Sequence, residues 1–310
     1  MHCKRAMALF GVTMSLLIGI SNVFALESNT QDIDTLDNIN GIQNHRGVLV
    51  DQGKFTNELY YDDVDAWDII DEDAVDFEVR INPDKNKIYI KYFQDDGLGL
   101  MTLKNGSYYD VYRVNDNLTL SLYNGEGLYT LGLYRRIDLT SGKSHEQDVL
   151  RIESSNNTSI TASIGENAIC TYKDVESFAT IANSMSAKST STHDYIMNCY
   201  KYVVESLDYD TEFYNLKTSG GTIEKYWCPN VEATIEKGKG ICCEQASLMA
   251  SLLRCKGIPT RIIYGYLLDD DNSFHAWVEA YEDGQWVFYD PTWQIYGNNN
   301  AHRYILYKYC

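Results

Sequence analysis

Apolar and polar residues alternate along the first half of the chain, beginning at about Phe77. A period of two is typical of strands with one buried face, and clusters of Asn, Asp and Gly separate the segments. Six segments follow this pattern, and we expect each to be a strand: 76–82, 87–94, 107–114, 117–124, 127–137 and 148–155. Short strands at this spacing predict a small β-sandwich domain over residues 76–165. It carries no catalytic constellation, which favours a spacer or binding role.

The pattern changes near residue 165, where we place a domain boundary. Residues 174–188 and 192–207 have apolar residues at helical spacing. A long loop follows, and an apolar, helix-patterned run begins near Ile241. Three strands are then expected, at 259–268, 273–281 and 285–293. Helices followed by an antiparallel run of strands indicate an α+β fold for residues 166–310.

The first 25 residues have the composition of a secretory signal peptide. Lys4 and Arg5 precede an apolar stretch, and small or β-branched residues before the end of the segment predict cleavage after Ala25. The alternative is a membrane anchor, but the stretch is shorter than the ~20 residues that a bilayer requires. Residues 26–75 are acidic and weakly periodic, and we interpret them as a leader or linker. We therefore expect a secreted or cell-surface protein without a membrane span after signal cleavage.

Charge and cysteine content narrow the class of protein further. The formal net charge is −18, and no basic patch is visible, which disfavours nucleic acid as a partner. In an exported protein, an odd number of cysteines fits one reactive thiol with three disulfides, or several unpaired buried cysteines. Seven cysteines remain after the signal: Cys170, Cys199, Cys228, Cys242, Cys243, Cys255 and Cys310.

Two adjacent cysteines stand where a glycine-rich turn becomes a helix, in the stretch GKGICCEQASLMASLLRCKGIP. Gly238 and Gly240 permit a tight turn before the helix. Cys242 then lies in the first helical turn, on the face that it shares with Ala246, Met249 and Leu253. A helix N-terminus favours a thiolate over a thiol, so Cys242 is a candidate nucleophile. Its neighbour Cys243 is expected to point about 100° further around the helix, away from this site.

A thiolate nucleophile needs a partner that accepts and returns a proton. His275 lies in the strand FHAWVEAY, and Asp290 ends the next strand, WVFYD, across a tight turn. Neighbouring strands can therefore bring the carboxylate beside the imidazole and orient it. A buried cysteine, a structural histidine or a turn aspartate is the more common explanation of each residue alone. Together the three patterns predict a Cys242-His275-Asp290 catalytic triad.

These segments resemble the transglutaminase-like core family of secreted bacterial proteins. The resemblance covers about residues 175–295 and is carried by residues 238–266, FHAWVEAY and WVFYDPTW. It implies a papain-like α+β fold in which Cys242 is the nucleophile, His275 the base and Asp290 the orienting carboxylate. Cys243 and Gln245 depart from the residue types that are common in the family at these positions. In cross-linking members a tryptophan upstream of the cysteine helps to form the acyl pocket, and Trp227 precedes the cysteine here.

The chemistry that these residues support is acyl transfer from a carboxamide or a peptide bond. Hydrolysis by a protease or deamidase and transfer to an amine in a cross-link both remain open. No metal or nucleotide motif appears, and the chemistry requires no cofactor. We expect a protein or peptide substrate, with cell-wall and surface proteins as candidates. Two alternatives stand beside this prediction: a catalytically inactive surface-associated binding protein with the same fold, and a secreted scaffold held by disulfides.

Overall fold

A computed structural model gives the fold and the side-chain contacts of most of the chain. It describes residues 55, 57–71, 77–84, 86–92, 99–105, 108–114, 117–123, 127–136, 144–154, 160–219, 227–268 and 273–309. The predicted signal peptide and Cys310 lie outside the described residues. Within this described part, no helix is long and apolar enough to cross a membrane.

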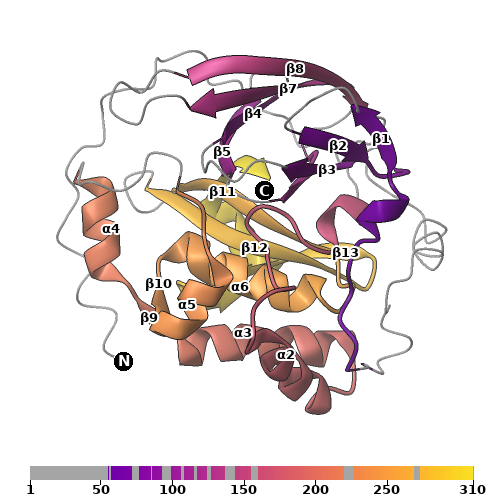
Figure 1. Ribbon diagram of the computed structural model, residues 1–310. Coiled ribbons are helices and arrows are strands. Elements are labelled where there is room, and N and C mark those ends of the chain that lie inside the picture. The colour runs from indigo at the N-terminus through magenta and orange to yellow at the C-terminus, as the bar shows by residue number, and fades with distance from the viewer. Residues whose placement is uncertain are drawn as a thin grey trace.

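Two four-stranded antiparallel sheets make up the first half of the fold (Figure 1). One sheet has the order β1 (Asp68–Asp71), β2 (Phe77–Ile81), β3 (Lys87–Tyr92) and β6 (Leu118–Ser121). The other has the order β5 (Tyr108–Val114), β4 (Gly99–Asn105), β7 (Gly127–Arg136) and β8 (Ser144–Ser154). Val79 and Ile90 of the first sheet share one buried cluster with Leu131 and Ile152 of the second. The two sheets therefore enclose a common apolar core, as in a β-sandwich.

All six strands that the alternating pattern predicts are present, and two others join them. Strand β4 lies between β5 and β7, in a segment that the pattern did not single out. Strand β1 belongs to the stretch interpreted as an acidic leader, yet it pairs with β2 across an irregular register. Just before it, the buried Tyr60 donates its backbone N–H to the carbonyl of Cys255, at 2.7 Å. The end of the acidic segment is thus built into the fold.

The second half combines helices with a five-stranded antiparallel sheet, which confirms the α+β class. The helices are α2 (Phe178–Ala187), α3 (Thr192–Ser206), α4 (Thr211–Thr218), α5 (Val231–Lys237) and α6 (Cys242–Arg254). The sheet has the order β14 (Ile295–Tyr296), β13 (Gln285–Asp290), β12 (Phe274–Glu282), β11 (Thr260–Leu267) and β15 (Tyr304–Tyr309). In the view of Figure 1, helices α2, α3, α5 and α6 lie below this sheet and the two sandwich sheets lie above it.

The segment between α3 and α6, expected to be a loop, contains two short helices. Asp210 caps α4 by accepting a hydrogen bond from the backbone N–H of Phe213, and Asn230 caps α5 in the same way. Gly238 ends α5 in the left-handed conformation, with a φ of 62°. Two-residue strands β9 (Asp208–Tyr209) and β10 (Lys239–Gly240) then pair in parallel and bring the chain to the start of α6.

Helix α6 is the centre of this half. Every residue from Cys243 to Arg254 is buried, because α3, α5 and the sheet surround the helix. The buried Arg254 at its end donates to the hydroxyl of Tyr123, at 2.6 Å, and to the carbonyl of Thr260, at 2.7 Å. Tyr123 in turn donates to the carbonyl of Ala162, at 2.9 Å. A buried guanidinium therefore joins the helical half to the chain that leaves the sandwich.

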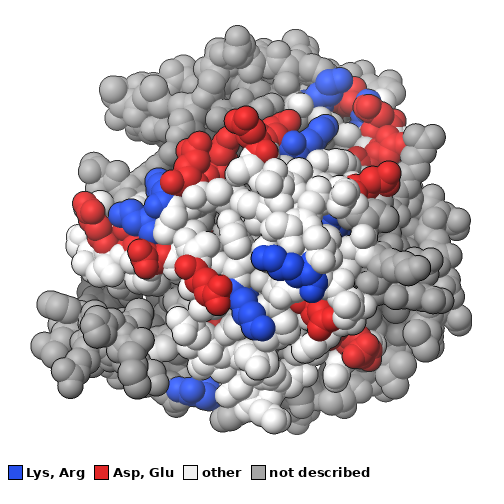
Figure 2. All heavy atoms as spheres, turned by 90° about the horizontal axis from the view of Figure 1, so that it is seen from below, with Lys and Arg blue, Asp and Glu red and all other residues white. Residues whose placement is uncertain are grey.

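Surface charge is unevenly distributed around this framework. Figure 2 shows the face that lies below in the view of Figure 1, where acidic and basic side chains are interspersed with a broad uncharged surface. Away from this face, in the cleft between the two halves, Lys308 of β15 forms a mostly buried ion pair with Asp110 of β5. This pair links the five-stranded sheet to the sandwich, in addition to the contact that Arg254 of α6 makes with Tyr123.

Removing the Tyr123 hydroxyl tests the link between the two halves. We expect Tyr123→Phe to lower the free energy of unfolding by about 1–3 kcal/mol, because a buried guanidinium loses an acceptor. Tyr266→Phe is the control, since it removes a phenol hydroxyl from the aromatic surface cluster with Phe274 and Tyr307. Urea unfolding of both variants measures the difference, and equal stabilities would show that the Arg254–Tyr123 contact contributes nothing.

Candidate active site

The start of α6 is held by hydrogen bonds to both backbone groups of Ile241 and by close packing at Gly240. The backbone N–H of Ile241 donates to the side chain of Glu244, at 2.9 Å, and the carbonyl of Ile241 accepts the N–H of Gln245, at 3.0 Å. A Cβ on Gly240 would lie 2.8 Å from the Cβ of Glu244, so this position requires glycine. The first residue of the helix is therefore Cys242, as the sequence predicts, and its side chain is half-buried.

His275 and Asp290 come from adjacent antiparallel strands, β12 and β13. Nε2 of His275 lies 2.8 Å from Oδ2 of Asp290. Both side chains are buried, with 6% of the His275 side chain exposed and none of that of Asp290. The hairpin register pairs Val278 with Tyr289, so Asp290 comes opposite Trp277, two residues from His275 on the same face of β12.

Hydrogen bonding and charge interaction with His275 both lower the pKa of the Cys242 thiol, so all three predicted residues meet in one place. Because Nε2 of His275 faces Asp290, Nδ1 is the ring nitrogen left for the sulfur. The backbone N–H of Ala276 lowers the pKa of the same thiol as well. The arrangement is therefore a continuous chain from thiol to imidazole to carboxylate.

Cys243, which we expected to point about 100° further around the helix and away from this site, is buried and interacts with Cys242. The side chain is buried in the core around α6, because that helix is enclosed on all its faces. A hydrogen bond from Cys243 is the largest influence that lowers the pKa of the Cys242 thiol; burial opposes it, and His275 and the Ala276 N–H add to it. The net effect holds the pKa of Cys242 well below its ordinary value, whereas the same contact and burial hold that of Cys243 well above.

The electrostatics of His275 complement those of the thiol. Burial disfavours the charged ring, but the charge and hydrogen bond of Asp290, together with Cys242, outweigh it and raise the pKa of His275 to about 10. A raised histidine pKa and a lowered thiol pKa favour a thiolate–imidazolium pair at neutral pH. Such a pair is the reactive form of a cysteine nucleophile.

Asp290 is held by four donors, of which the sequence analysis named only His275. Oδ1 accepts the backbone N–H groups of Thr292, at 2.9 Å, and Trp293, at 3.0 Å. Oδ2 accepts from His275 and from the hydroxyl of Tyr304, at 2.8 Å. An aspartate before a proline commonly makes such backbone contacts, so the Asp-Pro pair is a signal for the first two. Tyr304 is distant in the sequence and carried no such signal.

Gln245, which departs from the family pattern, connects the helix start to the Asp290 turn. Its amide nitrogen donates to the carbonyl of Gly240, at 3.2 Å, and its amide oxygen accepts from the hydroxyl of Thr292, at 2.8 Å. The side chain is buried. Gln245 therefore fixes the distance between the element that carries Cys242 and the turn that carries Asp290.

A glycine makes room for the ring that supports His275. Gly265 on β11 pairs with His275, and a Cβ there would lie 2.1 Å from the carbonyl oxygen of Ile305 and 2.4 Å from the Trp277 ring. The Trp277 ring fills this space and stacks against His275, with a centroid separation of 6.4 Å and an interplanar angle of 20°. His275 and Trp277 thus lie on the same face of β12, as strand alternation requires.

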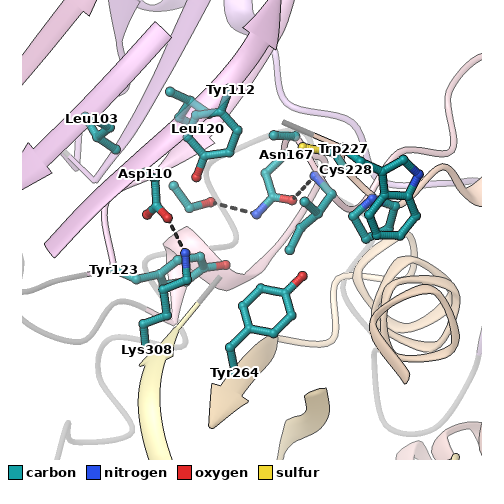
Figure 3. A pocket seen from close by; sticks show the side chains of 14 residues that line it. Leu103, Asp110, Tyr112, Leu120, Tyr123, Asn167, Trp227, Cys228, Tyr264 and Lys308 are labelled. Carbon is teal, nitrogen blue, oxygen red and sulfur yellow. Dashed lines mark hydrogen bonds and ion pairs between the residues drawn. The ribbon is translucent and has the colours of Figure 1, made fainter. Parts of the chain in front are cut away.

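A cavity of about 150 Å³ lies between the sandwich and the helical half, and Cys228 is the cysteine in its wall (Figure 3). Figure 3 shows Tyr112 and the Asp110–Lys308 pair on one side and Trp227 with Cys228 on the other. None of the three triad candidates lines it. Tyr264, which does, is paired on the sheet with Ala276, the residue whose N–H lowers the pKa of the Cys242 thiol.

Comparison with known proteins matches this part of the chain to one family. Residues 179–291 match the family described as the transglutaminase-like superfamily. The chain contains a transglutaminase-like core. That core includes α2 to α6 and strands β11 to β13, and it contains Cys242, His275 and Asp290.

The similarity to individual known proteins is partial or of low sequence identity. A protein-glutamine gamma-glutamyltransferase of Pseudomonas aeruginosa is 38% identical over 68 residues, which is 18% of this chain and 10% of that protein. The chain thus spans about a tenth of the length of that curated relative. A crystal structure of a TGase aligns with 39% of this chain and 32% of its own, at 24% identity and a TM-score of 0.34. The periplasmic domain of TgpA from Pseudomonas aeruginosa aligns with 71% of this chain and 88% of its own, at 14% identity and a TM-score of 0.32.

The cysteines bear on the alternative of a disulfide-held scaffold. No disulfide joins the six cysteines that the structure describes, from Cys170 to Cys255. Cys170, Cys199 and Cys255 are fully buried in the core around α6. Burial raises the pKa of all three thiols, which makes them poor nucleophiles. Cys242 differs from them in the direction of its shift.

Neutralising Asp290 tests the electrostatics of the site. In Asp290→Asn the imidazolium loses its anionic partner, so the pKa of His275 falls from about 10 towards its ordinary value and the thiolate loses its counter-ion. We expect iodoacetamide labelling of Cys242 at mildly acidic pH to slow by at least about tenfold, the equivalent of one pKa unit.

The matched control is Glu282→Gln, which neutralises another buried carboxylate of the same sheet, in contact with Tyr289 and His193. It should leave the labelling rate unchanged. If both variants label Cys242 as fast as the unaltered protein does, Asp290 has no electrostatic influence on the thiol.

Proposed function

We propose that this chain is a cysteine acyl-transfer enzyme in which Cys242 is the nucleophile, His275 the general base and acid, and Asp290 the orienting carboxylate. The observation that carries the proposal is that His275 interacts with both the Cys242 sulfur and Asp290 in a buried site. The match of residues 179–291 to the transglutaminase-like superfamily supports a cysteine acyl-transfer or protease chemistry.

The first half-reaction breaks a carbon–nitrogen bond. The Cys242 thiolate attacks the carbonyl carbon of a carboxamide or peptide bond and forms a carbon–sulfur bond. The electron pair moves onto the carbonyl oxygen and then returns as the carbon–nitrogen bond breaks. The His275 imidazolium gives its proton to the departing nitrogen, which leaves as ammonia or an amine. The product is a thioester on Cys242 with a neutral His275.

The second half-reaction releases the acyl group. Neutral His275 takes a proton from water or from a primary amine as that nucleophile attacks the thioester carbon. The carbon–sulfur bond breaks and Cys242 departs as a thiolate, which restores the ion pair with His275. Water yields a carboxylate, the outcome for a deamidase or protease. A lysine amine yields an isopeptide bond, the outcome for a cross-linking enzyme.

The start of α6 supplies donors for the negative oxygen of the intermediate. The first N–H groups of a helix have no acceptor within the helix, and they carry partial positive charge. The N–H groups of Glu244 and Gln245 bond to the Ile241 carbonyl, and that of Ile241 bonds to the Glu244 side chain. The N–H groups of Cys242 and Cys243 are therefore the ones positioned to stabilise an oxyanion next to the sulfur.

The cavity of Figure 3 is the proposed site for the part of the substrate that flanks the reacting group. Its wall includes Trp227, which precedes the nucleophile in the sequence, and Tyr264. Tyr264 is paired on the sheet with Ala276, whose backbone N–H acts on the Cys242 thiol. Trp227 is held in place by Phe213, with ring centroids 5.1 Å apart, and by the ammonium of Lys217, 3.9 Å from the ring centroid. A cavity of about 150 Å³ suits a single amino-acid side chain, which fits a protein or peptide substrate.

The first 25 residues support export of the protein, since they have the composition of a signal peptide. Surface or cell-wall proteins are then candidate substrates. We further infer that the sandwich, residues 76–165, is a separate domain that borders the cavity and so contributes to substrate selection, with residues 166–310 as the catalytic domain.

The activity test uses a glutamine-rich unfolded protein as acyl donor and a labelled primary amine as acceptor. Ammonia release, amine incorporation and new peptide ends distinguish deamidation, cross-linking and proteolysis. We expect Cys242→Ala to abolish whichever activity is present. Cys243→Ala should retain it at a rate reduced by about tenfold or less, because it removes only a hydrogen-bond donor.

A thioester trapped on Cys242 by an activated ester of glutamine would give the same answer by mass spectrometry. If Cys242→Ala keeps the activity, or if the thioester forms on Cys243, the proposed nucleophile is wrong. If the unaltered protein neither forms a thioester nor processes any donor, the inactive binding protein becomes the better interpretation.

A further inference from the structure

Tyr304 reaches the site from outside the segment that matches the transglutaminase-like superfamily. It is the first residue of β15 and follows the short helix η5 (Asn298–Arg303), whereas the matched segment ends at residue 291. Its hydroxyl donates to Oδ2 of Asp290 at 2.8 Å. This is the oxygen that also faces Nε2 of His275, likewise at 2.8 Å.

We propose that Tyr304 is a positioning residue that fixes the Asp290 carboxylate and, through it, the His275 ring. The proposal rests on the proposed function, because it assigns Tyr304 a part in the same triad. It extends that function to β15, a strand that neither the sequence patterns nor the matched family segment includes.

The Tyr304 ring is itself held in one orientation. Its centroid lies 4.7 Å from that of Phe288 and 5.0 Å from that of Trp277, at interplanar angles of 55° and 59°. The strand is secured by antiparallel pairing with β11, where Tyr304 is opposite Leu267. At the other end of β15, Lys308 is paired with Asp110 of the sandwich. The hydroxyl direction is therefore set by packing and by strand pairing.

The remaining contacts of Asp290 leave a gap that Tyr304 fills. Oδ1 is bound by Thr292 and Trp293, two N–H groups of the turn that follows Asp290 itself. Oδ2 would otherwise depend on His275 alone, the residue whose charge changes in each half-reaction. A second donor from another strand keeps the carboxylate plane fixed while the imidazole gains and loses its proton.

The Tyr304 hydroxyl keeps its proton at any pH at which the enzyme would work. Burial, the charge of Asp290 and the hydrogen bond to it all raise the pKa of Tyr304, and only the more weakly acting Arg303 lowers it. The hydroxyl therefore remains a donor and does not exchange protons with the site. Its role is geometric, in contrast to that of His275.

The test is Tyr304→Phe in the full chain, which keeps the ring and removes only the hydroxyl. Tyr289→Phe is the matched control: this buried tyrosine also lies on the sheet next to Asp290, but its hydroxyl donates to Glu282. The readout is the rate of iodoacetamide labelling at Cys242, followed from acidic to neutral pH.

In Tyr304→Phe we expect the acidic limb of the labelling profile to move up by about 0.5–1 pH unit. That displacement corresponds to a three- to tenfold slower labelling on the limb, because 1 unit is a factor of about ten. Tyr289→Phe should overlay the unaltered protein. Thermal unfolding of both variants shows whether a general loss of stability accompanies the change.

Three outcomes would overturn the proposal. An unchanged profile in Tyr304→Phe would show that the hydroxyl does not position the triad. A limb displaced to lower pH would show that it weakens the Asp290 charge instead of orienting it. Equal displacement in Tyr304→Phe and Tyr289→Phe would show a loss of stability without specific positioning.

Asp290→Asn separates this proposal from the proposed function. If Asp290→Asn slows the labelling and Tyr304→Phe does not, the triad stands and only the positioning role fails. If the unaltered protein shows no labelling of Cys242 at acidic pH, the activated thiol is absent and both proposals fail.

Discussion

The contact between His275 and Asp290 is the interaction on which the arrangement of the site depends. A carboxylate with no solvent exposure is costly to bury, unless nearby donors and a positive charge compensate it. The hairpin of β12 and β13, the turn after Asp290 and strand β15 all supply such donors. Once the carboxylate is compensated, it favours an imidazolium on His275, and the imidazolium favours a thiolate on Cys242.

The charges of Asp290, His275 and Cys242 depend on one another, so the site requires both helix α6 and the five-stranded sheet. Helix α6 presents Cys242 at its N-terminus, where partial positive charge favours an anion. The sheet presents His275 and Asp290. Gln245 bridges the two through Gly240 and Thr292, so the distance from sulfur to imidazole is set by buried hydrogen bonds rather than by a surface loop. Cys243 is buried beside Cys242 in the same helical turn, and its hydrogen bond lowers the pKa of the Cys242 thiol further.

Local patterns in the sequence predict much of this structure. Alternation and helical spacing identify the sandwich strands, α2, α3, α6 and the strands β11 to β13, because each of these elements buries one clear face or is bounded by Gly, Asn or Asp. Element ends, a hairpin and a helix N-terminus predict that Cys242, His275 and Asp290 lie near one another, and in the structure they interact. The catalytic roles of the three residues stay predictions.

The features that the sequence did not reveal depend on contacts between distant segments. The burial of Cys243 results from α6 being enclosed on every face, which the apolar positions of a single helix do not indicate. Tyr304 lies on a short edge strand, and nothing near it in the sequence relates it to Asp290. Strand β1 has the sequence DIID, which does not alternate between apolar and polar residues, so its pairing with β2 could not be predicted.

The central claim is that Cys242 is a thiolate paired with an imidazolium in the free protein. The most direct measurement is a pH titration of ultraviolet thiolate absorbance, taken as the difference between the unaltered protein and Cys242→Ser. The account predicts a transition well below the ordinary pKa of cysteine, about 8.5, which moves up towards that value when Asp290→Asn is present in both proteins. A single transition near 8.5 that Asp290→Asn does not move would contradict it.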